Sequence, residues 1–120
     1  MNANVSDSRH LAIPVLFSTD LRSSSVFYSD GLGFAVYKEA DGLRVRRSDL
    51  DLKVTLTGDT APLTNLSVVF RVHKIRKLHN EYVDRALPNL GQLKLGACGK
   101  LQFSLSDPDG NSLYFVEEAA

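Results

Sequence analysis

The sequence has no tryptophan, no excess of charge of either sign, no long apolar run, and only one cysteine, Cys98. A single cysteine excludes an intrachain disulfide and a cysteine-based metal site. Fourteen basic and fourteen acidic side chains give a formal net charge of zero, so no global field attracts nucleic acid or an anionic membrane. Since no segment approaches the ~20 apolar residues of a membrane span, we expect neither nucleic acid nor membrane as a partner.

Two further absences concern the compartment and the thiol. Residues 1–10 are polar and lack the apolar segment of a secretory signal, which predicts a cytoplasmic protein. Without a second cysteine or an obvious activating pattern, Cys98 is expected to be a buried or half-buried small apolar residue rather than a nucleophile.

The first half of the chain predicts a strand, a helix and three further strands. Residues 11–17 are apolar, which indicates a buried strand, and Pro14 within them favours an edge position. Asp20 is suited to cap a helix over residues 21–30. Apolar residues then alternate with polar ones over residues 34–56, which is typical of a meander with one apolar face.

The second half repeats this order after a turn-rich segment, residues 57–65. Residues 66–72 predict a strand, and residues 74–87 predict a helix. A weak strand is expected near residues 92–95, and two stronger strands are expected further on, around the turn at 107–110. The apolar stripe of the helix contains Ile75, Leu78, Tyr82 and Ala86.

An internal repeat of strand, helix and three strands predicts the fold class more firmly than any single element. We expect an α+β protein in which two βαβββ modules form a concave mixed sheet around a pocket, with helices on the convex side. The expected single domain covers residues 1–120, with modules at about residues 11–57 and 65–117.

Three short motifs resemble those of the vicinal oxygen chelate superfamily, which includes glyoxalases, extradiol dioxygenases and bleomycin-resistance proteins. The first is Asp20-Leu21, and the second is a Phe-Tyr pair followed by Gly-Leu-Gly-Phe at residues 27–34. The third is Asp-Pro-Asp-Gly-Asn at residues 107–111, ahead of Leu-Tyr-Phe. The resemblance extends from about residue 13 to residue 117, and it supports the two-module fold.

In the enzymes of this superfamily, His and Glu side chains on the concave face hold a divalent metal, which needs at least three such ligands. The resemblance places those positions at Ile13, Lys53, Ser67 and Tyr114, none of which suits a metal. We therefore predict no metal site and no cofactor. The three histidines, His10, His73 and His79, are expected to be surface residues.

Strand alternation also predicts which side chains line the pocket. Four are basic, and Asp51 is the one acid assigned to the same face, so a carboxylate or phosphate ligand is favoured. Arg44 and Arg46 could instead guard a strand edge at the rim, whereas Arg71 interrupts an otherwise apolar strand. The predicted ligand-binding residues are Ile13, Val15, Phe17, Tyr37, Arg44, Arg46, Lys53, Ser67, Val69, Arg71, Gln102, Ser104 and Tyr114.

The resemblance without the metal ligands implies a binding protein like the bleomycin-resistance proteins, which are homodimers that sequester a drug in grooves formed jointly by two chains. The small-molecule ligand could be an antibiotic or a metabolite. Two departures from those acidic proteins are the neutral charge and the missing tryptophan. One alternative is a glyoxalase- or dioxygenase-like lyase or transferase of the same fold, either metal-dependent with ligands at other positions or metal-free with Tyr37 or Tyr114 as the acid. The other alternative is a ligand-sensing or protein-docking module.

Overall fold

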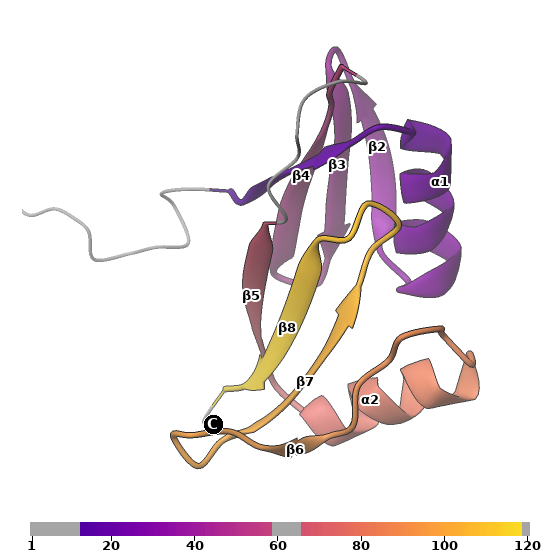
Figure 1. The fold of residues 1–120 in the computed structure, drawn as a ribbon. Helices are drawn as coiled ribbons and strands as arrows, with labels where there is room; N and C mark the ends of the chain where they lie inside the picture. Colours follow the sequence, from indigo (N-terminus) through magenta and orange to yellow (C-terminus); the bar gives the residue numbers. More distant parts are fainter. Residues whose placement is uncertain (1–12, 59–65, 119–120) are drawn as a thin grey trace, which may run out of the picture.

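The computed structural model describes residues 13–58 and 66–118, which form two four-stranded mixed sheets and two helices (Figure 1). The first sheet has the order β1-β4-β3-β2, and the second has the order β5-β8-β7-β6. The α+β fold of two βαβββ modules is thus confirmed, with the strands divided between two sheets. The strands are β1 Val15–Ser18, β2 Ala35–Glu39, β3 Gly42–Arg47, β4 Leu50–Leu56, β5 Ser67–Val72, β6 Lys94–Leu95, β7 Leu101–Ser106 and β8 Ser112–Glu117.

The two sheets are built by the same pairing rule. In each, the first strand of the module runs parallel to the last, β1 to β4 and β5 to β8, while the other pairs are antiparallel. The parallel pairing requires a crossover, which the helix of each module supplies. Strand β1 lies at a sheet edge, as Pro14 predicted, and the Pro14 carbonyl still accepts a hydrogen bond from the Lys53 N–H.

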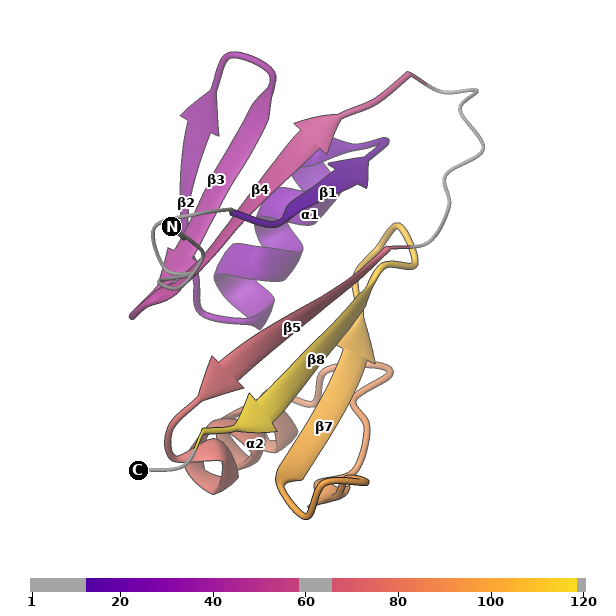
Figure 2. The same ribbon diagram turned by 90° about the vertical axis from the view of Figure 1, so that its left-hand side faces the viewer.

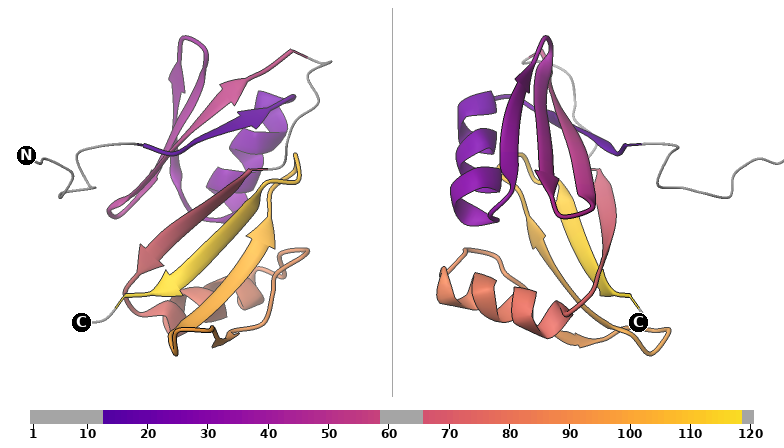
Figure 3. Two further views of the ribbon diagram at one scale, coloured as in Figure 1. Left: turned by 60° about the vertical axis from the view of Figure 1, so that its left-hand side comes forward. Right: turned by 180° about the vertical axis from the view of Figure 1, so that it is seen from behind.

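Each helix covers one face of the sheet of its own module (Figures 1 and 3). Helix α1, Leu21–Val26, begins at the predicted cap, where the Asp20 carboxylate accepts hydrogen bonds from the N–H groups of Arg22 and Ser23. It continues as a π-helical turn, η2, over Phe27–Gly31.

Helix α2, Ile75–Asp84, is shorter than the predicted 74–87, because the chain turns into the left-handed region at Lys74 and again at Ala86. Ile75 and Tyr82 are buried as expected, whereas Ala86 is exposed and lies beyond the helix. Neither helix among the described residues has the length and apolar character needed to cross a membrane.

One apolar core runs through both modules. Leu16, Leu52 and Val54 fill the first module, and the rings of Phe103 and Phe115 stack at 4.9 Å in the second. Phe34 and Phe70, with ring centroids 6.0 Å apart, continue the core from one module to the other. The modules of a single chain therefore share buried apolar surface.

Two buried tyrosines and one ion pair also connect the modules. Tyr28 donates to Asp107 Oδ2 at 3.0 Å, and Tyr82 donates to the Leu32 carbonyl at 2.9 Å. Burial raises the pKa of Tyr82 to about 12, so its hydroxyl stays protonated. Arg47 on β3 and Glu81 on α2 form a bidentate pair at 2.7 and 2.8 Å.

The exposure of Cys98 and of His79 differs from the sequence predictions. Cys98 is exposed, because it lies in the turn between β6 and β7, outside the apolar core. His79 is half-buried: its Nε2 lies 2.9 Å from the Gly91 carbonyl, and its ring packs against Phe103. His73 is exposed, as predicted, and His10 lies outside the described residues.

Candidate functional site

Both sheets leave one face uncovered, the face opposite α1 and α2, and we call these the open faces. Figure 2 shows them turned to the same side of the molecule, with the helices behind. Burial alternates along the strands as the sequence predicted: β5 reads exposed, buried, exposed through Ser67, Val68 and Val69. The buried residues point to the helix side, so the remaining residues form the open faces.

In the first module, strand register brings the predicted residues into one array. Val15 pairs with Lys53, Lys53 pairs with Arg44, and Arg44 pairs with Tyr37, so these four side chains form a row across the open face. Phe17 and Arg46 lie on the same face, in the rows to either side. Ile13 precedes β1 and is half-buried, so it lies at the margin of this array.

In the second module, a corresponding row contains Val69, Tyr114 and Ser104, which are partners in neighbouring strands. Ser67, Arg71 and Gln102 lie on the same open face. The structure therefore places every predicted residue from Val15 to Tyr114 on an open face.

Apolar side chains are exposed on the open faces to an unusual degree. Of nine exposed large apolar residues among those described, five lie here. Patches of this kind mark sites of interaction in soluble proteins. The sequence predicted a concave pocket lined by these residues, and in a single chain their side chains lie on an open surface. The five are Val15, Phe17, Tyr37, Val69 and Tyr114, with exposed fractions between 36% and 55%.

Charged residues on the open face of the first module are mostly paired. Arg44 donates to both carboxylate oxygens of Asp51 at 2.6 and 2.7 Å, and these hydrogen bonds hold the pKa of Asp51 below its usual range. Arg46 lies 3.6 Å from Asp51, and Lys53 lies 3.5 Å from Glu39. By contrast, Arg71, on the open face of the second module, forms no salt bridge with any residue in 13–58 or 66–118.

The assignment of Asp51 as the one acid on this face was therefore wrong, because Glu39 lies there too. Glu39 follows Tyr37 by two positions on β2, so strand alternation could have placed it on the same side. Lys94, the strand partner of Gln102, is exposed and lies on the open face of the second module. Five basic residues, Arg44, Arg46, Lys53, Arg71 and Lys94, therefore accompany two acidic ones, an excess of three. Val116, the partner of both Arg71 and Gln102, is another residue of the second module's open face that sequence reasoning missed.

The chemistry of these faces does not fit a metal centre. The four positions implied by the resemblance hold an aliphatic side chain, an ammonium, a hydroxyl and a phenol, and none is a usual ligand for a divalent cation. Within residues 13–58 and 66–118, no three His, Cys, Asp or Glu side chains cluster so as to hold a metal ion. We derive no metal-assisted step for this protein.

Several solved structures have the same fold as this chain. A bleomycin resistance determinant encoded on transposon Tn5 superimposes with a TM-score of 0.79 at 23% identity, over 91% of this chain and 98% of that one. The bleomycin-binding protein of Streptomyces verticillus, in complex with copper(II)-bleomycin, gives 0.77 at 26% identity over 99% and 100% of the two chains. A lactoylglutathione lyase from Agrobacterium tumefaciens gives 0.69 at 17% identity, over 89% and 93%.

No curated protein matches the sequence. The family model of the glyoxalase/bleomycin resistance protein/dioxygenase superfamily matches residues 9–115, which is nearly the whole chain. The chain therefore belongs to the glyoxalase/bleomycin resistance protein/dioxygenase superfamily.

Proposed function

We propose that this protein binds and sequesters a small molecule on its open faces, as a homodimer and without a metal. The observation that carries the proposal is the concentration of exposed Phe17, Tyr37, Val69 and Tyr114 on the side of the molecule that its helices leave uncovered. Aromatic and aliphatic side chains crossed by a few polar groups are typical of small-molecule sites.

A second copy of the chain is proposed because one chain leaves this surface open. Binding sites for small molecules usually bury about 70–90% of the ligand, which an open sheet face cannot do. A second open face laid over the first would create a cleft with aromatic walls, and it would also cover Val15 and Val69, which are 41% and 55% exposed. We therefore expect dimerisation and ligand binding to use the same surface.

The ligand class follows from the side chains that are free to meet it. Phe17, Tyr37 and Tyr114 offer ring faces and edges for aromatic groups. Arg71 has no salt bridge among the described residues, which favours a ligand that carries a carboxylate, a phosphate or an electron-rich ring. Binding of a bleomycin-type antibiotic is the specific case suggested by the similarity to the Streptomyces verticillus protein.

An enzymatic function is the second candidate, since the lactoylglutathione lyase has the same fold. The positions discussed above do not supply metal ligands, so such an enzyme would have to work without one. Tyr114, flanked across the strands by Ser104 and Val69, is then the group to consider as a proton donor.

Three measurements on the untagged protein test the proposal. Light scattering should give twice the chain mass of 13.2 kDa, and elemental analysis should find no stoichiometric metal. A thermal-shift screen with EDTA, containing bleomycin and aromatic carboxylates, should give at least one compound that raises Tm, because a ligand of the native state stabilises it by mass action. A monomer with stoichiometric Zn, Ni, Mn or Fe would contradict the proposal, as would turnover that depends on added metal.

A further inference from the structure

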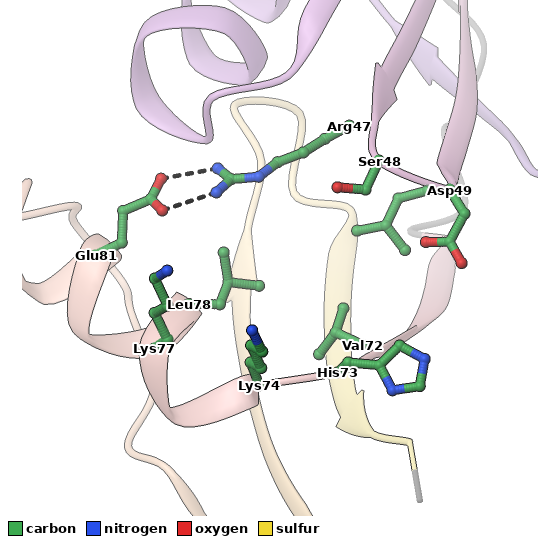
Figure 4. A pocket seen from close by; sticks show the side chains of 10 residues that line it. Arg47, Ser48, Asp49, Val72, His73, Lys74, Lys77, Leu78 and Glu81 are labelled. Atoms are coloured by element: carbon green, nitrogen blue, oxygen red, sulfur yellow. Dashed lines mark hydrogen bonds and ion pairs between the residues drawn. The ribbon is translucent and has the colours of Figure 1, made fainter. Parts of the chain in front are cut away.

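A cavity of about 330 Å³ lies at the junction of the two modules, on residues that the open faces do not use. The turn Ser48–Asp49 and the end of β3 form one wall, and the end of β5 with the first turns of α2 forms the other (Figure 4). Its volume falls at the lower end of the range for small-ligand pockets, roughly 300–1,000 Å³. The cavity can therefore hold a compact molecule in contact with both modules.

Basic side chains line the α2 side of this cavity (Figure 4). Lys74 and Lys77 extend from the start of α2 into the space beneath Arg47 and Ser48 (Figure 4). Neither lysine forms a salt bridge with any residue in 13–58 or 66–118, and the Lys74 side chain makes no capping bond to its helix. Two ammonium groups thus face the cavity without a carboxylate partner in the described chain.

The acidic groups of the cavity do not cancel this charge. Glu81 already forms ion pairs with Arg47, at 2.7 and 2.8 Å, and with Arg85, at 3.1 Å. Asp49 is the other carboxylate of the lining. Two lysines against one aspartate leave an excess of positive charge, and the imidazole of His73 also belongs to the lining.

The base of the cavity is apolar. Leu50 and Val72 expose only 9% and 7% of their surface, and Leu78 packs against the core beside them. A ligand that satisfies both parts of this cavity would carry an anionic head toward the lysines and a short apolar group toward the leucines and valine. Inorganic ions satisfy only the first part.

We propose that this junction cavity is a second binding site, separate from the open faces, for a small organic anion such as a phosphate monoester or carboxylate with an apolar substituent. Lys74 and Lys77 would bind the anionic head through charge-assisted hydrogen bonds, which are stronger than neutral ones. Because the walls come from both modules, a bound anion would also strengthen the contact between them.

The test is a calorimetric titration of the full chain with phenyl phosphate, benzoate and neutral benzyl alcohol, with backbone NMR shifts to locate binding. At least one of the two anions should bind and shift the amides of residues 48–50 and 72–78, while benzyl alcohol should not. Loss of two charged hydrogen bonds in Lys74→Gln/Lys77→Gln should weaken affinity about tenfold or more. Lys77→Gln alone serves as a second variant, because Lys74 occupies a left-handed backbone position.

The matched control is Lys38→Gln/Arg76→Gln, which removes the same net charge. Arg76 is on the same helix but does not line the cavity, and Lys38 is an exposed residue of β2 on the helix side of the first sheet. The control should retain the affinity of the parent protein. Equal weakening in both double variants would overturn the proposal, and so would binding of neither anion or shifts confined to Arg71 and Tyr114 on the open face.

Discussion

The two modules share one fold but differ in the chemistry of their open faces. Behind both sheets, the buried residues are almost all aliphatic or aromatic. In front, the first module presents five charged residues joined by ion pairs, whereas the second presents hydroxyls, an amide, a phenol and two basic residues, Arg71 and Lys94, which form no salt bridge with any described residue. The five are Glu39, Arg44, Arg46, Asp51 and Lys53.

This difference indicates which side-chain positions of the two modules must stay apolar and which can vary. The helix side must keep its apolar pattern, because a change there alters the packing of a core that both modules share. The open side carries no such constraint, so each half can supply different groups to one binding surface. We expect substitutions to separate the two roles: helix-side changes should lower stability, and open-face changes should lower binding.

The largest effect is expected from neighbouring residues on opposite sides of β8. Phe115 is fully buried and stacks on Phe103, so Phe115→Ala should lower the free energy of unfolding by about 3–5 kcal/mol. Tyr114→Ala, one residue away, should cost less than about 1 kcal/mol, since its side chain is exposed, yet it should weaken ligand binding. Urea denaturation measures the first effect. Equal loss of stability in both variants would contradict the separation of roles.

The next effect concerns the turn between β7 and β8, where Asp107 contacts Tyr28 of the other module. Asp107 accepts hydrogen bonds from the Tyr28 hydroxyl, from the Asn111 side chain and from two backbone N–H groups. Asp107→Ala would leave several of these buried donors without partners, so we expect a loss of about 2–3 kcal/mol in urea denaturation. The control, Asp109→Ala, removes a carboxylate whose partner, Thr19, is exposed, and it should cost much less. A similar cost for both would show that the buried network contributes little.

A smaller effect should appear in the dependence of stability on pH. The hydrogen bonds from Arg47 hold the pKa of Glu81 below its ordinary value of 4.5. The stability from this pair is therefore present above that value and is lost as pH falls through the lowered pKa. Glu81→Gln should be less stable than the parent protein above about pH 5, and the two should converge toward about pH 2. A constant difference across this range, or the same profile for Glu118→Gln, would contradict the assignment.

The smallest effect on stability is expected from the ion pairs of the open face. Arg44→Gln breaks the bidentate pair with Asp51, whose side chain is 24% exposed, so screening by solvent should keep the loss of stability small. Arg71→Gln should change stability by less than about 0.5 kcal/mol, but it should weaken binding of anionic ligands. Differential scanning calorimetry measures the first change. A loss from Arg71→Gln that exceeds the loss from Arg44→Gln would reverse the comparison of the two faces.

Much of the fold could be predicted from the sequence, because β3, β4 and β7 alternate cleanly between apolar and polar residues and the order of elements repeats. The alternation placed Val69 and Tyr114 on one face, and the acidic cap at Asp20 fixed the start of α1. The π-helical turn over Phe27–Gly31 was not predicted, and its Tyr28 donates a hydrogen bond to Asp107, 79 residues away, which no local pattern reveals. The exposure of Cys98 depends likewise on the tertiary structure, since the turn that holds it lies outside the apolar core.

The candidate site was harder to predict than the fold. Parity identified the residues of the open faces, but it did not show that Glu39 neutralises Lys53, because that pairing depends on side-chain conformation. The junction cavity was not predicted, since its walls meet only when the two modules pack. Contacts between distant segments, such as Arg47 with Glu81, leave no local pattern in the sequence.

The most direct test of the central claim is a chemical-shift map of the metal-depleted, ¹⁵N-labelled protein titrated with copper-free bleomycin and with phenylacetate. We predict that at least one of them shifts amides along β1, β5 and β8, around Phe17, Val69 and Tyr114, with EDTA present. A response that appears only after a divalent metal is added, or that avoids these strands and falls on the helices, would contradict a metal-free binding site on the open faces.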